Sequence, residues 1–146
     1  MTVIAIKDGV LACDSGIFAG GVYVGSVTKA ARMSNGNVIG AAGEYGAISP
    51  FLAQCEGGHD ADLPDDLPKD SWALMLSASG GIYCLDGPHK GWFVIDAPFA
   101  ALGSGANIAI GAMAAGASAE RAVEIACEWA EGCRGPVRIF KAGERP

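Results

Sequence analysis

The sequence predicts an α+β fold, because signals for antiparallel hairpins alternate with a few longer helical segments. Short apolar, β-branched runs lie on both sides of three turn sequences, Asp8-Gly9, Asn35-Gly36 and Ser79-Gly80-Gly81. Pairs of runs around a Gly-containing turn are typical of β-hairpins. Between and after the hairpins, apolar residues recur every three to four positions, which indicates helices. Antiparallel strands combined with separate helices place the chain in the α+β class.

Strands are expected wherever apolar and β-branched residues form a short run. These runs occupy residues 3–7, 10–14, 29–33, 38–42, 72–77, 82–85, 92–96, 99–102 and 137–141. The Gly-rich stretch from 16 to 25 has apolar residues at 22–24 and is assigned no strand. Residues 56–69 are acidic and contain two glycines and two prolines, so we expect them to form an exposed loop.

Helices are expected in three places. Residues 44–54 have apolar side chains at helical spacing, although Pro50 fits only in a first turn or at a kink. Residues 106–115 form a second helix that is rich in small side chains. A third helix begins after Ser118, a favourable N-cap residue, and runs to about residue 129. The core-facing stripe of this helix is predicted to contain Ala119, Ala122, Val123, Ala126 and Trp129.

Composition limits the possible size and partners of the protein. The length of 146 residues fits one domain covering residues 1–146. Only 18% of the residues are charged, so part of the surface is expected to be buried against other chains. A net charge of −6 without basic runs argues against nucleic acid and membrane surfaces as partners. Because neither a membrane span nor a signal peptide is evident, we expect a cytoplasmic location, in the host cell if a phage encodes the chain.

Cysteines and histidines give no support for a metal or a disulfide framework. The cysteines are odd in number and form no Cys-x-x-Cys pair, so most are expected to be reduced core residues. They are Cys13, Cys55, Cys84, Cys127 and Cys133. The segment His59-Asp60-Ala61-Asp62 is a weak metal-binding pattern, because neither His59 nor His89 has a partner at ligand spacing. No metal and no cofactor are predicted.

The second residue is a threonine, which has special chemistry when it is the first residue of a chain. Its hydroxyl is then a nucleophile, and its own α-amine can accept the proton. An α-amine has an unperturbed pKa of about 7.7–8.0, which suits a base near neutral pH. Loss of Met1 would give Thr2 this position. Taken alone the signal is weak, because most terminal residues are merely mobile.

Five segments in a fixed order give Thr2 more significance. They are residues 2–5, 10–15, 25–29, 38–43 and 102–106. They are similar, in turn, to a nucleophile strand, a strand ending in a catalytic aspartate, a stretch carrying a catalytic lysine, a strand and glycine before a helix, and a Gly-Ser-Gly helix start. Together they resemble the proteasome β-subunits and the bacterial HslV peptidase, and most of all the short proteasome-like proteins of bacteria and phages. The resemblance covers nearly the whole chain.

This resemblance implies a four-layer αββα sandwich, in which two antiparallel sheets lie between helix layers. It implies a threonine-type peptidase of the N-terminal-nucleophile class that acts on peptides or unfolded proteins within a homo-oligomeric ring. Thr2 would attack the substrate carbonyl, while Lys29 would favour the ionised hydroxyl and Asp14 would hold Lys29 in place. The backbone N–H of Gly43 would stabilise the oxyanion. Ser104 would bond the α-amine and relay its proton.

Several positions depart from the family pattern and leave alternatives open. The spacing from Thr2 to Asp14 is short, and a different strand register would put Met1 on the nucleophile position. Gly16 stands where many family members have an arginine. The acidic loop at 56–69 replaces a longer helical region, so we expect a thinner helix layer, and docking to an ATPase partner is doubtful. The alternatives are a catalytically silent proteasome-like structural subunit that retains Met1, and a small-molecule amidase of the same class.

Each of these site residues also has an ordinary structural interpretation. Asp14 at a strand end is typical of a turn, and Lys29 of a solvated strand lysine. Ser104 between two glycines is typical of a helix N-cap. A Gly-Ser-Gly before a helix also occurs at phosphate sites, but Ile108 occupies the third glycine position of a dinucleotide motif.

Overall fold

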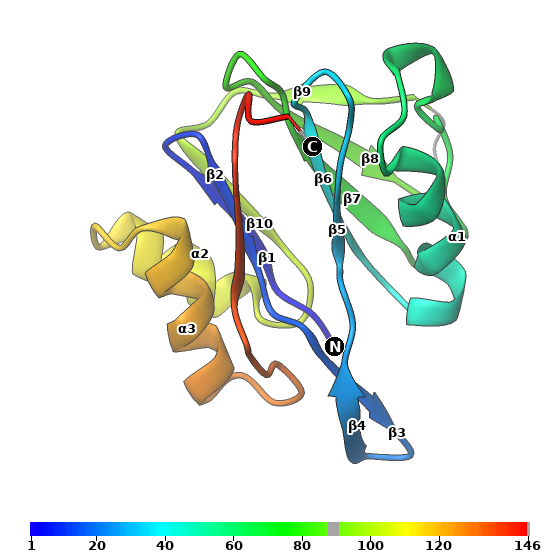
Figure 1. The fold of residues 1–146 in the computed structure, drawn as a ribbon. Coiled ribbons are helices and arrows are strands. Elements are labelled where there is room, and N and C mark those ends of the chain that lie inside the picture. The colour runs from blue at the N-terminus through cyan, green and yellow to red at the C-terminus, as the bar shows by residue number, and fades with distance from the viewer. Residues whose placement is uncertain (88–90, 146) are drawn as a thin grey trace.

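Two antiparallel β-sheets pack face to face between layers of helices. The computed structural model describes residues 1–87 and 91–145. Figure 1 shows α2 (Ala106–Ala114) and α3 (Ala119–Trp129) on the outside of one sheet and α1 (Tyr45–Cys55) on the outside of the other. This arrangement confirms the predicted α+β class and the four-layer αββα sandwich.

The first sheet has the strand order β10-β1-β2-β11, and all its neighbouring strands are antiparallel. Its strands are β1 (Ile4–Lys7), β2 (Val10–Cys13), β10 (Phe99–Leu102) and β11 (Arg138–Lys141). The predicted Asp8-Gly9 turn joins β1 to β2. Because β11 pairs with β2, the last part of the chain lies beside the first, and the loop before β11 comes close to the N-terminus.

The second sheet has the strand order β5-β6-β7-β8-β9 and is also antiparallel throughout. Its strands are β5 (Ala30–Arg32), β6 (Val38–Ala42), β7 (Trp72–Leu76), β8 (Ile82–Asp86) and β9 (Phe93–Ile95). The hairpin turns predicted at residues 35–36 and 79–81 join β5 to β6 and β7 to β8. Strands β9 and β10 follow each other in the sequence but belong to different sheets, so the chain changes layer between them.

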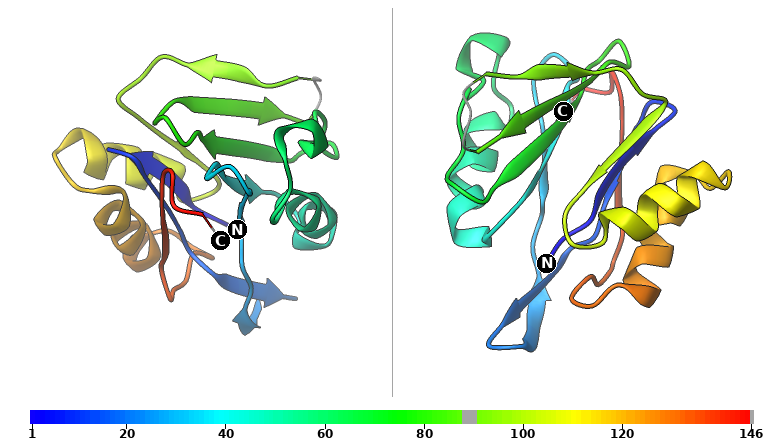
Figure 2. Two further views of the ribbon diagram at one scale, coloured as in Figure 1. Left: turned by 45° about the horizontal axis from the view of Figure 1, so that its top comes forward. Right: turned by 180° about the vertical axis from the view of Figure 1, so that it is seen from behind.

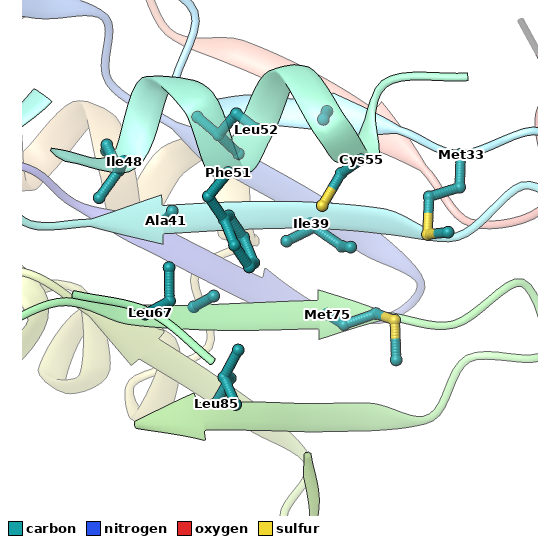
Figure 3. Close-up of a cluster of buried hydrophobic side chains, with 12 residues drawn as sticks. Met33, Ile39, Ala41, Ile48, Phe51, Leu52, Cys55, Leu67, Met75 and Leu85 are labelled. Carbon is teal, nitrogen blue, oxygen red and sulfur yellow. The ribbon is translucent and has the colours of Figure 1, made fainter. Parts of the chain in front are cut away.

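Three clusters of buried side chains fill the spaces between the layers. Ile4, Leu11 and Leu76 belong to the cluster between the two sheets. A second cluster joins the first sheet to α2 and α3. The third lies between α1 and the second sheet, where Figure 3 shows Phe51 of α1 pointing toward the strands. Burying each large apolar side chain contributes roughly 1.5–3 kcal/mol, so these clusters account for the layer order.

Strand β1 is buried on both of its faces, and this fixes the start of the chain. Ile4 and Ile6 point into the cluster between the sheets, while Val3 and Ala5 point toward α2 and α3. Successive side chains of a strand alternate between its faces, which produces this division. The residue that precedes this segment, Thr2, is therefore held in a defined place rather than being a loose chain end.

The Gly-rich stretch after β2 forms a hairpin that the sequence did not reveal. Strands β3 (Gly16–Ala19) and β4 (Val22–Ser26) pair only with each other, antiparallel and with an irregularity between Ile17 and Phe18. The hairpin projects from the body of the molecule, and the N-terminus lies near its base (Figures 1 and 2). We call residues 16–26 the arm. Its glycines interrupted the alternation that marks a strand, so the assignment of no strand to residues 16–25 was wrong.

Two other expectations need correction. Trp129 was predicted to face the core but is 77% exposed, because α3 ends there beyond the cluster that buries Ala119, Ala122 and Ala126. The 56–69 segment is not exposed throughout. It contains the short 3-10 helix η1 (Asp60–Asp62), and Leu67 is buried against the cluster under α1.

Three further expectations concern the cap of α3, the histidine at position 89 and membrane-spanning helices. Ser118 caps α3 as predicted, accepting a hydrogen bond from the Arg121 backbone N–H. His89, which was weighed as a metal ligand, lies outside the described residues. Among the helices of the described ranges, none combines the length and apolar character needed to cross a membrane.

Candidate active site at the N-terminus

Thr2 is 3% exposed and lies just before β1, whereas Met1 is 62% exposed. The main-chain nitrogen of Thr2 donates a hydrogen bond to Ser104 Oγ at 3.1 Å. The carbonyl of Thr2 accepts from the Gly105 N–H at 3.2 Å. The turn between β10 and α2 therefore holds both main-chain polar groups of Thr2.

Gly103 in this turn has a packing reason to be glycine. It has a φ angle of 99°, a region that favours glycine, and a Cβ at this position would lie 2.1 Å from the Thr2 carbonyl oxygen. The backbone of the turn can approach Thr2 only because no side chain intervenes. The Gly-Ser-Gly sequence is thus explained by its contact with the N-terminal segment, and the Ser104 hydroxyl is used by Thr2 rather than as a helix cap.

Asp14 and Lys29 form a buried ion pair next to this segment. Lys29 Nζ donates to Asp14 Oδ1 at 3.1 Å and to Oδ2 at 3.0 Å, and the two residues are 3% and 0% exposed. Asp14 also accepts from the N–H groups of Val3 and Arg134, at 3.0 and 3.2 Å. Buried charges are tolerated only when they are paired and hydrogen-bonded, and this carboxylate meets that condition with both oxygens.

Besides its two bonds to Asp14, the Lys29 ammonium makes a third hydrogen bond, to the first residue of the chain. Lys29 Nζ donates to the Met1 carbonyl oxygen at 3.0 Å. That oxygen belongs to the peptide bond that ends at the Thr2 nitrogen, so Nζ lies within about 5 Å of this nitrogen. The two ordinary interpretations, a turn aspartate and a solvated lysine, do not describe these buried side chains.

Gly43 lies where two pockets meet. It follows β6, has a φ angle of 150°, and lines both pockets together with Thr2. One pocket, of about 320 Å³, lies against the arm and the start of α1. The other, of about 420 Å³, lies against Trp72 and the β10–α2 turn. A substrate chain bound across Thr2 would have room for side chains on either side.

All five residues singled out from the sequence are therefore neighbours at one end of the sandwich: Thr2, Asp14, Lys29, Gly43 and Ser104. Sequence reasoning missed two others. Cys133 Sγ lies 3.8 Å from Ser104 Oγ, and Arg134 donates its N–H to Asp14. Both precede β11, and no local motif marks them. Only the pairing of β11 with β2 brings them here.

The remaining candidates lie elsewhere or have other partners. His59 Nδ1 lies 2.9 Å from Ser34 Oγ, and Asp60 Oδ1 accepts from the Asn35 side-chain amide, so these two side chains tie η1 to the β5–β6 turn. All five cysteines are free thiols. Burial raises the pKa of the Cys133 thiol.

Cys13, directly before Asp14, makes a test of burial at this site possible. Burial, and secondarily the charge of Asp14, raises the pKa of the Cys13 thiol from 9.0 to about 12. The unfolded chain therefore loses this proton first as the pH rises above 9, so stability falls with pH between 9 and 12. From about pH 7.5 to about pH 10.5, we expect the wild type to lose roughly 1–2 kcal/mol more unfolding free energy than Cys13→Ala. Denaturant titrations of both proteins at the two pH values measure this, and equal losses would contradict the buried thiol.

Comparisons with known proteins place the fold. The sequence matches no family model and no curated protein. Among solved structures, Thiobacillus denitrificans BPH in complex with epoxomicin is similar, with a TM-score of 0.66 and 19% identity over 98% of this chain and 99% of that one. A second structure of Thiobacillus denitrificans BPH is similar with a TM-score of 0.66 and 20% identity, over 97% of both chains. Eukaryotic HslV from Trypanosoma brucei also has a TM-score of 0.66, at 18% identity over 96% and 98%. The chain thus has the fold of these proteasome-like proteins.

Proposed function

We propose that this chain is a threonine-type peptidase subunit that uses Thr2 as its nucleophile once everything before Thr2 has been removed. One observation carries the proposal: the Thr2 nitrogen is bonded to Ser104 Oγ on one side, and the carbonyl attached to it is bonded to the buried Lys29 on the other. The fold shared with HslV and BPH supports the same function.

Removal of Met1 changes what Lys29 can do. An ammonium group has three protons, and Lys29 gives two of them to Asp14 and the third to the Met1 carbonyl. Without Met1 the third proton is free, and the nearest new acceptor in the proposal is the Thr2 hydroxyl. A cation in this place stabilises the developing alkoxide, because the site is shielded from water and electrostatic interactions are stronger there.

The proposed reaction then needs no group beyond the chain and water. Thr2 Oγ attacks the substrate carbonyl while its proton passes to the free α-amine, with Ser104 Oγ as the hydrogen-bonded relay. The oxyanion is stabilised by the Gly43 N–H, and the C–N bond breaks as the leaving amine takes the proton. An ester on Thr2 remains, which water attacks while giving one proton to the α-amine. The C–O bond to Thr2 then breaks, the free acid leaves, and the α-amine returns that proton to Thr2 Oγ.

A second candidate function follows from the contacts of Met1. Its carbonyl is bonded to Lys29, and its side chain lies against Gly132, where a Cβ would meet Met1 Sδ. A Met1 held in this way favours the catalytically silent structural subunit. In that state the nitrogen of Thr2 is an amide and cannot accept a proton.

Two preparations of the same chain decide between these functions. One begins with Met1, and the other is released from an N-terminal fusion by cleavage directly before Thr2, with both starts verified by intact-protein mass spectrometry. We expect turnover of a fluorogenic peptide only by the chain that begins with Thr2. Epoxomicin, which is bound in a structure of the similar Thiobacillus protein, should inhibit that turnover. Equal turnover by both preparations would overturn the role of the α-amine, and no turnover by either would favour the silent subunit.

The proposal extends to the assembly and its surroundings. We propose a homo-oligomeric ring that encloses a peptide or unfolded-protein substrate, in the cytoplasm, as in the short bacterial and phage proteins that the sequence resembles. Large apolar side chains are exposed on several elements, including Val22 at 63%, Val94 at 66% and Trp129 at 77%. The low charged fraction of 18%, against about 25% in a typical soluble domain, supports burial of part of the surface against other chains. Size-exclusion chromatography with light scattering is expected to give a mass several times that of one chain, and a monomer at micromolar concentration would contradict the ring.

A further inference from the structure

The smaller of the two pockets has a wall built from the arm. Ile17 and Phe18 of β3 and Tyr45 and Ile48 of α1 line it together with Thr2 and Lys29. These four side chains are apolar or aromatic, and Ile48 is buried. Pockets that bind ligands have this character, with apolar walls and few polar groups. A volume of about 320 Å³ has room for a large side chain.

A two-stranded hairpin is marginally stable alone, so the position of this wall depends on what holds the arm. The Phe18 ring packs edge-on against Tyr23 of β4, with 5.7 Å between ring centroids and 63° between ring planes. The guanidinium of Arg134 lies over the Tyr23 ring, 3.9 Å from its centroid. The described contacts therefore connect the pocket wall to Arg134 through two aromatic rings.

Arg134 is itself anchored at the buried ion pair. Its N–H donates to Asp14 Oδ2 at 3.2 Å, and its carbonyl accepts from the N–H groups of Ser15 and Gly16 at 3.0 and 2.8 Å. Gly16 leaves the space for this approach, because a Cβ there would lie 2.7 Å from Arg134 Cβ. These anchoring bonds all use the main chain, so the side chain of Arg134 can be changed without removing them.

We propose that Arg134 is a positioning residue that sets the arm wall of this pocket through Tyr23 and Phe18, and so tunes how well a large apolar side chain of the peptide substrate fits there. This rests on the proposed function for the identity of the substrate. The hydrogen bonds and ring contact described above join Arg134 to Asp14, Ser15, Gly16 and Tyr23, so it acts on the pocket through other residues. It selects substrates by keeping Phe18 against the pocket, and its effect differs between large and small side chains.

The test compares two blocked peptides that differ only by Phe or Ala at the residue whose carbonyl is attacked. For the chain beginning with Thr2, the ratio of kcat/KM values for the Phe and Ala peptides is measured in the wild type, Arg134→Ala, Arg134→Lys and Tyr23→Leu. A cation–π contact at an exposed site corresponds to a factor of about 2–5, so we expect the ratio to fall about 2- to 5-fold in Arg134→Ala and Tyr23→Leu. Arg134→Lys restores a cation over the ring and should restore the ratio. Arg121→Ala, an exposed arginine on α3, is the matched control.

A binding measurement separates this proposal from the proposed function. In Thr2→Ala the same two peptides are not cleaved, and calorimetry gives their dissociation constants. We expect the Phe peptide to bind more tightly than the Ala peptide, with the difference reduced about 2- to 5-fold by Arg134→Ala. If the wild type cleaves neither peptide but this difference is present, the proposed chemistry fails and the pocket stands. If Arg134→Ala leaves the ratio of kcat/KM values for the Phe and Ala peptides unchanged, whether or not both values fall, the positioning role is overturned.

Discussion

Replacing Thr2 by alanine is expected to lower peptide turnover by at least about 1,000-fold, because the proposed nucleophile is lost. Ser104 Oγ is bonded to the Thr2 main chain, and its use as a nucleophile would break that bond. Thr2→Ser keeps the hydroxyl and should keep measurable turnover. Initial rates with a fluorogenic peptide measure both variants, after mass spectrometry has verified that each chain begins at residue 2.

The chain offers a matched control for this substitution. Thr28 is the other threonine of the sequence, and it is exposed and next to Lys29. Thr28→Ala removes the same atoms close to the same lysine, and we expect turnover within about 2-fold of the wild type, as for a surface substitution. Thermal unfolding of Thr2→Ala should show an intact fold, because the contacts of residue 2 described above are made by its main chain. Turnover by Thr2→Ala at the wild-type rate would remove Thr2 from the mechanism.

Replacing Asp14 by alanine is expected to destabilise the protein by about 3–5 kcal/mol, the range for leaving one partner of a buried ion pair alone. The substitution strands the Lys29 ammonium, which is 3% exposed, and removes the acceptor of the Val3 and Arg134 N–H groups. Activity should be lost even where the chain still folds, because Lys29 would no longer be held toward Thr2. Chemical denaturation measures the stability, with Asp65→Ala, at an exposed carboxylate outside the site, as the control.

A double-substituted protein identifies the cause of that loss. Asp14→Ala combined with Lys29→Met leaves no buried charge, so it should be more stable than Asp14→Ala alone, although two main-chain N–H groups still lack their acceptor. The Lys29→Met protein alone should be affected less than Asp14→Ala, since its carboxylate keeps both main-chain donors. Additive effects of the two substitutions would mean that the pair is not the organising element of the site.

The proposed oxyanion role of Gly43 and the proposed relay role of Ser104 differ in how directly a substitution can test them. Gly43 cannot be replaced without other consequences, because a Cβ there would lie 2.7 Å from Ser71 Oγ. Ser104→Ala is more informative, since it removes the partner of the Thr2 nitrogen while leaving the Gly105 N–H bonded to the Thr2 carbonyl. The proposed relay role therefore predicts that Ser104→Ala lowers kcat, while the Gly105 N–H still holds the Thr2 carbonyl in place.

Much of the fold could be predicted because its signals are local. The Asp8-Gly9 and Asn35-Gly36 turns, the helical periodicity of residues 119–126 and the Ser118 cap each involve a few neighbouring residues, and the structure has them as predicted. The resemblance of five short segments to the proteasome-like family singled out Thr2, Asp14, Lys29, Gly43 and Ser104, which the structure then places together. Periodicity gave the buried face of α3 but not how far the sheet below extends, so Trp129 was assigned wrongly.

The sequence by itself thus determined the three hairpins with marked turns and the helices, and its resemblance to a known family supplied the residues of the candidate site. Only the tertiary structure decided that the Gly-rich residues 16–26 form an arm beside the pocket, and that Cys133 and Arg134 reach the site. The physical reason is the range of the interactions. Arg134 meets Asp14 across 120 positions, through strand pairing between β2 and β11 that no local pattern encodes. Thr2 and Ser104 likewise meet across 102 positions, because β1 and β10 pair in one register.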